Sequence, residues 1–302
     1  MIKTIYVTGD IHGHVDIHKL SNKNFRPDKN QKERYSVQGN EDHNDYLIVT
    51  GDLGFPFHTV EFDENFNPKE KQYKYWLNWL ANKPYTILFC DGNHENFDFW
   101  DAQPVYEWHG GKVHIHPNAP NIIHLIRGEV YDICGYSVLA FGGAASHDIK
   151  PEFDCFGHCI WKGRVEGKSW WKHEQATEEE KAHAREALAK RGNHVDVILT
   201  HTPPASIVKA RFEEEDRALR EQYAIVGAKH GIDISDIIKE HEYTPDPTAE
   251  FLDEILASTD YRIWLCGHIH KDYINYENKL AVLYRKVVPF DTLLYETDDL
   301  LV

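Results

Sequence analysis

Five short apolar runs, each followed by a glycine or a polar residue, dominate the pattern of this chain. They cover residues 2–7, 45–50, 85–90, 195–200 and 261–266 and are rich in Val, Ile, Tyr and Leu. Runs of this length and composition are typical of buried β-strands. The pattern therefore predicts five strands that are widely spaced along the chain.

Stretches with helical spacing lie between these runs. Residues 68–82, 177–191 and 248–257 each predict a helix. The second of these begins with a capping pattern, in which Thr177 is followed by Glu180, and ends beside a glycine. A chain that alternates strand and helix forms a largely parallel sheet, with its functional residues at the carboxyl ends of the strands.

The spacing changes between residues 112 and 141, where apolar runs follow one another closely. The runs at 112–116, 121–126, 129–133 and 136–141 predict an antiparallel meander. Together, the two patterns predict one mixed α/β sandwich and not two separate domains. We expect a single domain that covers residues 1–302.

Two segments carry few periodic signals. Residues 21–44 are polar and predict an exposed loop or insertion. Residues 142–176 predict a long ordered loop insertion over the functional site, since long loops in compact domains are often functional.

The composition limits the classes of function and the compartment. A formal net charge of −16 at pH 7 argues against an extended nucleic-acid surface, although bound cations would still allow a phosphorylated substrate. No apolar run approaches the roughly 18 residues of a membrane span. The five cysteines are scattered, and the N-terminus enters a strand without a signal-peptide pattern. We therefore expect a cytoplasmic protein without a membrane partner.

Residue types that bind metals follow all five widely spaced strands, usually beside a glycine. After the first strand, Asp10 and His12 are two positions apart and project to the same side if strand geometry persists. Taken alone, this pair is either a hydrogen-bonded pair or two ligands of one metal. The same kind of residue at all five strand ends predicts a metal centre. The residues are Asp10, His12, Asp52, Asn93, His94, His201, His268 and His270.

The ordered motifs GDIHGH, GDLG, GNHE, HTPP and GHIH resemble those of the calcineurin-like metallophosphoesterase superfamily. The resemblance extends from residue 10 to residue 270. It implies an α/β fold that is a sandwich of two mixed β-sheets flanked by helices, and a centre of two metal ions. Matched position by position, one ion would be bound by Asp10, His12 and His270, the other by Asn93, His201 and His268, and both by Asp52.

The chemistry of these residues agrees with that assignment. A bridging ligand must offer two oxygens and a negative charge, as Asp52 does. Four imidazoles favour Mn, Fe, Co or Zn over Mg or Ca, which prefer oxygen ligands. Two such cations clamp the oxygens of a phosphate and hold a bridging hydroxide for in-line attack. The catalytic residues would be Asp52 and His94, the latter turned away from Asn93 and steadying the transition state or protonating the leaving group.

The sequence therefore predicts a metal-dependent phosphoester hydrolase that acts on a small phosphorylated molecule or nucleotide. The alternatives are a phosphodiesterase or nuclease, a protein phosphatase, and a non-catalytic scaffold. Protein phosphatases of the superfamily carry an arginine in the motif GDxVDRG, whereas this chain has GDLGFPF. Scaffold relatives usually lose metal ligands, and this chain keeps each of them. The sequence predicts no oligomeric state.

The predicted loop adds further candidates. The stretch from GGAASHD to GKSWWKHEQ resembles a loop of small bacterial and phage-associated members of the superfamily. Trp170 and Trp171 either contact the substrate or pack the loop, and packing is favoured. The candidate residues for substrate contact or support of the site are His147, Asp148, Arg164 and Glu174.

The remaining motifs have simpler interpretations. The CFGHC stretch, from Cys155 to Cys159, lacks the second ligand pair of a zinc site unless His147 or His173 serves. His114 and His116 share one face of a strand, where solvent exposure is expected. Arg127 is interpreted as a hairpin-turn residue, and the acidic run RFEEEDR, residues 211–217, as a solvated helix face.

Overall fold

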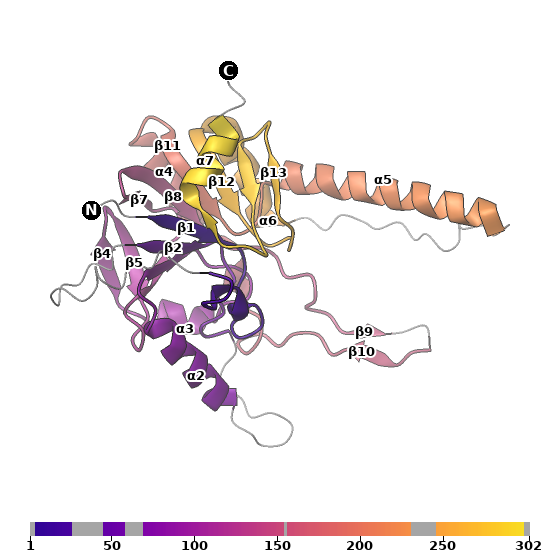
Figure 1. Cartoon of the computed structure of the whole chain (residues 1–302), viewed down its shortest axis with the longest axis horizontal. Helices are drawn as coiled ribbons and strands as arrows, with labels where there is room; N and C mark the ends of the chain where they lie inside the picture. Colours follow the sequence, from indigo (N-terminus) through magenta and orange to yellow (C-terminus); the bar gives the residue numbers. More distant parts are fainter. Residues whose placement is uncertain (1–3, 26–44, 58–68, 154–155, 231–245, 299–302) are drawn as a thin grey trace.

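Two mixed β-sheets lie face to face at the centre of the molecule (Figure 1). The computed structural model describes residues 4–25, 45–57, 69–153, 156–230 and 246–298. In this part of the chain, helices cover the outer faces of both sheets. The predicted α/β sandwich is therefore confirmed.

The first sheet has seven strands within the described residues, and its four adjacent strands β1, β2, β3 and β6 run parallel to one another. The strands at both edges run antiparallel. In spatial order the strands are β15 (Val288–Pro289), β1 (Ile5–Thr8), β2 (Tyr46–Val49), β3 (Thr86–Phe89), β6 (Ile122–Leu125), β5 (Gly111–Ile115) and β4 (Val105–Trp108).

The second sheet has six strands within the same ranges and a parallel centre. Two of the five predicted parallel strands belong to it, and the other three belong to the first sheet. In spatial order its strands are β13 (Tyr273–Asn275), β14 (Leu280–Val282), β12 (Asp260–Cys266), β11 (His194–Thr200), β8 (Tyr136–Phe141) and β7 (Val130–Ile133).

Both faces of the central strands are covered, which explains why their sequences are apolar throughout and do not alternate with polar residues. In β2, Ile48 packs in the core between the sheets, whereas Leu47 and Val49 pack on the opposite face. In β12, Leu265 faces the inner core, whereas Trp264 lies in the outer core of the second sheet.

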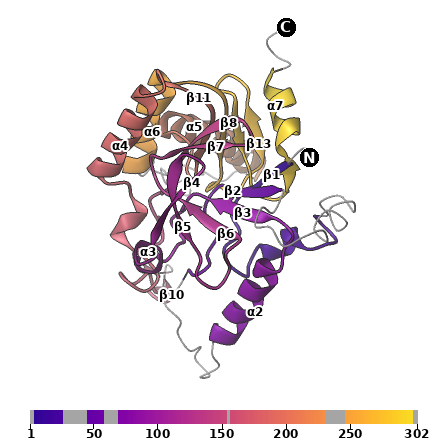
Figure 2. The ribbon, with the colours of Figure 1, turned by 90° about the vertical axis from the view of Figure 1, so that its left-hand side faces the viewer.

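Helices complete the two outer layers, which Figure 2 shows on opposite sides of the strands. The side chains of α2 join the outer core of the first sheet, and those of α4 and α6 join the outer core of the second. The bounds are α2 (Lys69–Ala81), α3 (Phe97–Asp101), α4 (Glu178–Ala189), α5 (Ala205–His230), α6 (Pro247–Ser258) and α7 (Phe290–Asp298), with 3₁₀ turns η1 (Ile17–Leu20) and η2 (Lys172–Glu174).

The three predicted helices are confirmed as α2, α4 and α6. The capping box of α4 is formed, because Glu180 N–H donates to Thr177 Oγ1 and Thr177 N–H donates to Glu180 Oε2. The run RFEEEDR, residues 211–217, lies on α5, where none of its residues is buried, as predicted. Figure 1 shows α5 projecting from the body of the molecule.

The predicted antiparallel meander is wrong. Strand β5 pairs with β6, and β7 pairs with β8, but β6 lies in the first sheet and β7 in the second. The chain crosses between the sheets at Arg127 and Gly128, and the φ of +80° at Gly128 favours glycine. The close spacing of the runs correctly indicated the hairpins β5–β6 and β7–β8. It does not show whether the connection between them is a third hairpin or a crossing to the other sheet.

Three single-residue expectations are also wrong. Arg127 is not an exposed hairpin residue but a buried one, whose guanidinium pairs with Asp91 and Glu180. His114 and His116 are buried and not exposed to solvent, since α2 and α3 cover this face of β5. The Nε2 of His116 lies 3.1 Å from the hydroxyl of Tyr73 on α2.

The segment 142–176 is more structured than a loop. It contains η2 and a two-stranded ribbon of β9 (Glu152–Phe153) and β10 (Cys159–Trp161), which projects from the body in Figure 1. Cys159 is free and exposed, whereas Cys155 lies outside the described residues. Most of the predicted loop 21–44 also lies outside them.

None of the helices in the described part of the chain combines the length and the apolar character that a transmembrane helix needs.

Candidate metal centre

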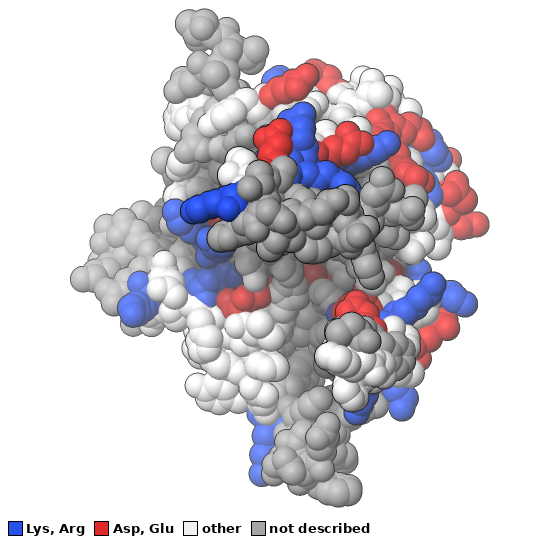
Figure 3. Space-filling view, turned by 90° about the vertical axis from the view of Figure 1, so that its right-hand side faces the viewer, with Lys and Arg blue, Asp and Glu red and all other residues white. Residues whose placement is uncertain are grey.

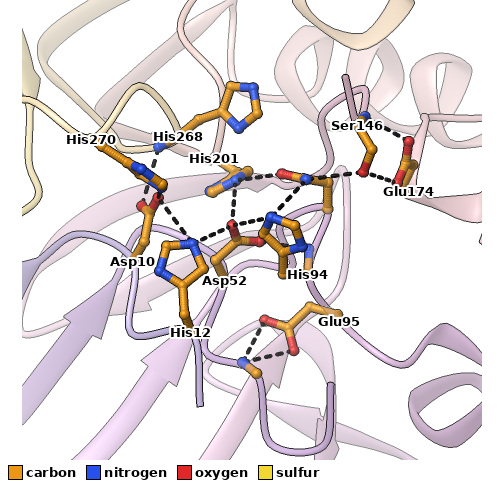
Figure 4. A network of polar contacts seen from close by, with 12 residues as sticks. Asp10, His12, Asp52, His94, Glu95, Ser146, Glu174, His201, His268 and His270 are labelled. Atoms are coloured by element: carbon orange, nitrogen blue, oxygen red, sulfur yellow. Dashed lines mark hydrogen bonds and ion pairs between the residues drawn. The ribbon is translucent and has the colours of Figure 1, made fainter. Parts of the chain in front are cut away.

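The residues that follow the five predicted parallel strands come together at the carboxyl ends of both sheets (Figure 4). Asp10 and His12 follow β1, Asp52 follows β2, and His201 follows β11. In the described chain, three overlapping groups hold ligand atoms within 4.8 Å of one another. The groups are Asp10 with His12 and His270, His12 with Asp52 and His94, and Asp10 with Asp52 and His201.

Four of the candidate ligands that follow the strands have a left-handed backbone. The φ angles are 48° at His12, 50° at Asp52, 67° at His268 and 51° at His270. Such values are uncommon for residues other than glycine and cost of order 1 kcal/mol each. Asp10 and His12 therefore lie side by side because the chain turns sharply after β1, and not because strand geometry persists.

The glycines beside the candidate ligands make room for other candidate ligands. A Cβ atom at Gly92, next to Asn93, would lie 2.0 Å from Oδ1 of Asp52. A Cβ atom at Gly267, next to His268, would lie 2.3 Å from Oδ1 of Asp10. Each glycine is therefore required by a carboxylate that comes from a different strand end.

Asp52 lies at the centre of the cluster and is almost fully buried. Its Oδ2 atom lies 3.2 Å from Nε2 of His12 and 3.4 Å from Nε2 of His201. Its Oδ1 atom accepts a 2.7 Å hydrogen bond from the backbone N–H of His94. One carboxylate oxygen, and not two as expected, thus faces two histidines that come from different sheets.

The outer nitrogens of those two histidines fix where their protons lie. Nδ1 of His201 donates to the carbonyl of Thr50 at 2.8 Å, and Nδ1 of His12 donates to the carboxylate of Asp16 at 2.7 Å. In the neutral rings, each Nε2 then directs a lone pair toward Asp52. A ring lone pair and a carboxylate oxygen repel each other. The arrangement therefore needs either a cation between the two atoms or a proton on Nε2 of the ring.

The histidine pKa values show the same demand for positive charge. Burial lowers the pKa of His201, but the charge and hydrogen bond of Asp52, the charge of Asp10 and the hydrogen bond to Thr50 together raise it to about 10. Burial likewise lowers the pKa of His12, and its hydrogen bond and charge interaction with Asp52 raise it to about 9. A bound metal cation would satisfy this demand without these protons.

Asp10 provides an independent indication of a cation. Its Oδ2 atom is buried, lies 3.1 Å from Nε2 of His270, and has no well-aligned hydrogen bond to the described residues. Its Oδ1 atom accepts from the backbone N–H of His268 at 3.1 Å. A buried carboxylate oxygen without a donor fits a metal ligand.

The residues expected around the second ion are less closely gathered. Oδ1 of Asn93 lies 3.2 Å from Nε2 of His201. The ring of His268 lies 4.9 Å from that of His201, measured between centroids. His268 does not belong to any of the close groups found among the described residues. The structure therefore brings Asn93 and His201 together, with His268 beside them.

His94 does not turn away from Asn93, contrary to the prediction. Its Nε2 atom lies 3.3 Å from Nδ2 of Asn93 and 4.0 Å from Oδ2 of Asp52. An amide nitrogen only donates, so Nε2 of His94 accepts and the proton of the neutral ring lies on Nδ1. Burial lowers the pKa of His94, and the charge of Asp52 opposes this shift.

The insertion reaches the centre through a residue that the sequence did not single out. Oγ of Ser146 accepts a hydrogen bond of 3.0 Å from Nδ2 of Asn93. Glu174 is fully buried and accepts two hydrogen bonds of 2.7 Å, from the N–H and the hydroxyl of Ser146. Ser146 lies in the quoted stretch GGAASHD, but serine is too common for the sequence to identify it.

The other candidates of the insertion lie farther from the cluster. Arg164 forms a bidentate ion pair with Asp148 and lies over the ring of Phe57, which contacts His94 edge-on at 4.9 Å between centroids. His147 is exposed, with its ring 6.0 Å from that of His268. Of the two tryptophans, Trp171 is buried and Trp170 is half-buried, which fits packing.

The donor set combines two carboxylates, one amide and several imidazoles in a mostly buried cluster. Mixed oxygen and nitrogen ligands of this kind suit divalent transition metals. The family model of the calcineurin-like phosphoesterases matches residues 3–272, a range that includes each of these candidate ligands. No curated protein matches the chain.

Proposed function

The chain belongs to the calcineurin-like phosphoesterase family, and we propose that it is a two-metal hydrolase of phosphoesters. The observation that supports this most directly is the position of Asp52, whose Oδ2 atom faces Nε2 of His12 and Nε2 of His201. A carboxylate between two imidazoles from different sheets is suited to bind two cations at once. The ions would be divalent transition metals such as Mn, Fe, Zn or Co.

We assign the two metal positions as the motifs imply. Asp52 would belong to both positions. When bound, the two cations neutralise phosphate oxygens and lower the pKa of a water that attacks phosphorus. The first position would be held by Asp10, His12 and His270, and the second by Asn93, His201 and His268.

The chain itself supplies the remaining parts of the reaction. Asp16 and Thr50 orient the rings of His12 and His201, so that Nε2 of each ring faces the centre. His94 would stabilise the phosphoryl oxygens or protonate the leaving alkoxide, because its Nε2 atom borders both Asn93 and Asp52. Either role requires a proton on Nε2, so the ring would have to be protonated when the ester is bound. Hydrolysis would then release an alcohol and inorganic phosphate.

The proposed substrate is a small phosphorylated molecule or a nucleotide. The chain carries a net charge of −16, and Figure 3 shows acidic and basic side chains interspersed on one face of the molecule. A long nucleic acid needs a continuous basic surface. The segment after Asp52 provides Phe55 and Phe57 in place of the arginine that protein phosphatases of the superfamily carry.

A comparison of two substrates in the same preparation tests this proposal. The metal content is measured first, and the hydrolysis of p-nitrophenyl phosphate and of its bis ester is then followed with Mn²⁺. We expect two ions per chain and faster hydrolysis of the monoester. Faster hydrolysis of the bis ester would identify a phosphodiesterase, and bound metal without turnover of either ester would identify a scaffold. A panel of nucleotides and sugar phosphates would then define the substrate.

The two positions are tested by removing one ligand from each. His12→Ala and His201→Ala should each weaken one of two Mn²⁺ binding steps, and excess Mn²⁺ should rescue the two variants to different extents. Loss of a ligand typically weakens its own site without abolishing the other. Unchanged metal content and rate in both variants would contradict the metal centre.

A further inference from the structure

The insertion sends a chain of three buried polar groups toward the metal centre (Figure 4). The carboxylate of Glu174 accepts from the hydroxyl of Ser146, and Oγ of Ser146 accepts from Nδ2 of Asn93. Their exposed fractions are 0% for Glu174, 9% for Ser146 and 5% for Asn93. Water therefore has little access to these groups, and each must find its partner within the protein.

The direction of each hydrogen bond follows from the carboxylate. Burial raises the pKa of Glu174 to about 7. Above that pH the ionised carboxylate accepts only, so the hydroxyl proton of Ser146 must point toward it. Oγ of Ser146 then has only lone pairs to offer to Asn93, and the side of the amide that faces it must be Nδ2. The second hydrogen on Nδ2 faces Nε2 of His94 at 3.3 Å.

The opposite side of the amide is thereby fixed as well. Oδ1 of Asn93 faces Nε2 of His201 at 3.2 Å, within the second proposed metal position. An amide that was rotated by 180° would turn an N–H group toward the cation and an oxygen toward Ser146. Such an amide cannot bind a metal through its nitrogen, because the nitrogen carries no free lone pair.

We propose that Glu174 is a positioning residue that acts through Ser146 to hold Oδ1 of Asn93 toward the second metal position. This inference rests on the proposed function, because it requires Asn93 to be a metal ligand. It gives the insertion a definite role, which is to orient one ligand of the centre from outside the five motifs. Residues that orient ligands in this way typically change metal affinity 10- to 100-fold.

The position of Glu174 does not depend on its own carboxylate. Its carbonyl accepts hydrogen bonds from the backbone N–H of Ala144 at 3.1 Å and from the guanidinium of Arg127 at 3.2 Å. A substitution of the carboxylate by an amide of the same shape therefore leaves the backbone contacts in place. Glu174→Gln isolates the direction of the hydrogen bonds from the packing.

Glu174→Gln should disturb the orientation of Asn93, because glutamine has an NH₂ group where glutamate has a second acceptor oxygen. The single acceptor of the glutamine must face the N–H of Ser146, so its NH₂ group faces Oγ of Ser146. The hydroxyl proton of Ser146 then loses its acceptor, and it stays unpaired or turns toward Asn93, which forces the amide to rotate. Titration of the metal-free protein with Mn²⁺ at about pH 8, where Glu174 is ionised, should show one binding step weakened about 10- to 100-fold, and the other nearly unchanged.

Two further variants separate positioning from general damage. Glu166→Gln makes the same chemical change in the same insertion, at an exposed residue that pairs with Lys172, and should leave both binding steps unchanged. Ser146→Ala removes the link between Glu174 and Asn93. In the Ser146→Ala background, Glu174→Gln should therefore have no further effect on Mn²⁺ affinity, whereas independent effects would simply add.

The outcomes separate this inference from the proposed function. If the parent binds two Mn²⁺ ions and Glu174→Gln binds them with the parent's affinities, the inference is wrong and the proposed function stands. The inference is also wrong if Glu174→Gln weakens binding equally with and without Ser146. If the parent protein itself binds no Mn²⁺, the proposed function fails. Melting of the metal-free variants shows whether each one is folded.

Discussion

The backbone N–H of His94 donates a 2.7 Å hydrogen bond to Oδ1 of Asp52. The strand end that carries the proposed acid therefore also orients the proposed bridging carboxylate. With Oδ1 held in this way, Oδ2 is left to face His12 and His201. The ends of β2 and β3 thus act as one unit, and a change at either should alter metal binding at both positions.

Asp52→Asn should keep the fold and lose most of the activity. The amide oxygen would accept from His94, which leaves the NH₂ group toward His12 and His201, where cations are proposed to bind. We expect fewer than two bound ions per chain and a kcat/KM lower by at least about 100-fold. Two retained ions with the parent's turnover would remove Asp52 from the bridging role.

Gly92→Ala should damage the metal centre. The new Cβ atom would lie 2.0 Å from Oδ1 of Asp52 and 2.5 Å from its backbone N, so both the carboxylate and the chain after β2 must move. We expect a weaker Mn²⁺ affinity, measured by titration of the metal-free protein. The control is Gly135→Ala, which strains the turn before β8 but meets no atom within 4 Å, and which should leave Mn²⁺ affinity unchanged. Equal Mn²⁺ affinity in the two variants would contradict this explanation of Gly92.

His94→Gln distinguishes proton donation from electrostatic stabilisation. A nitrophenolate leaves without a proton, whereas an alkoxide does not, so a general acid matters more for an alkyl phosphate. We expect a modest loss of kcat for p-nitrophenyl phosphate and a further loss of about 10- to 100-fold for an alkyl monoester. The comparison uses saturating metal for the parent and the variant. Equal losses for both esters would assign His94 to stabilisation of the phosphoryl oxygens alone.

His173 should make stability depend on pH in the alkaline range. Its hydrogen bonds with Asp101 and Glu180 raise its pKa from 6.5 to about 10. Because the folded state holds the proton more tightly, its stabilising effect is complete below pH 6.5 and is lost as the pH rises to about 10. The ring is about one-third exposed, so we expect only about 1–2 kcal/mol.

The measurement is the free energy of unfolding of the parent and of His173→Gln between pH 6 and pH 10. The difference between the two proteins should shrink as the pH rises. His194→Gln is the control, since His194 and Asp260 form an exposed pair at the surface and should contribute little at any pH. A difference that stays constant across this range would rule out His173 as the source.

The strands, the helices and the candidate ligands could be predicted from local features of the sequence. Apolar runs such as 45–50 and 261–266 became strands because burial on both faces requires apolar residues throughout. The candidate ligands could be found because each follows such a run closely, usually beside a glycine. The capping box at Thr177 could also be found, since its two partners are three residues apart.

The partners of the strands and of the side chains could not be predicted from the sequence, because they come from distant parts of the chain. The spacing of the runs between 112 and 141 did not show that the chain crosses from one sheet to the other at Arg127, because strand pairing depends on distant segments. The burial of His116 likewise depends on α2 and α3. The hydrogen bond between Glu174 and Ser146 joins residues 28 positions apart, and the one between Ser146 and Asn93 joins residues 53 positions apart. A local sequence pattern cannot predict contacts over such separations.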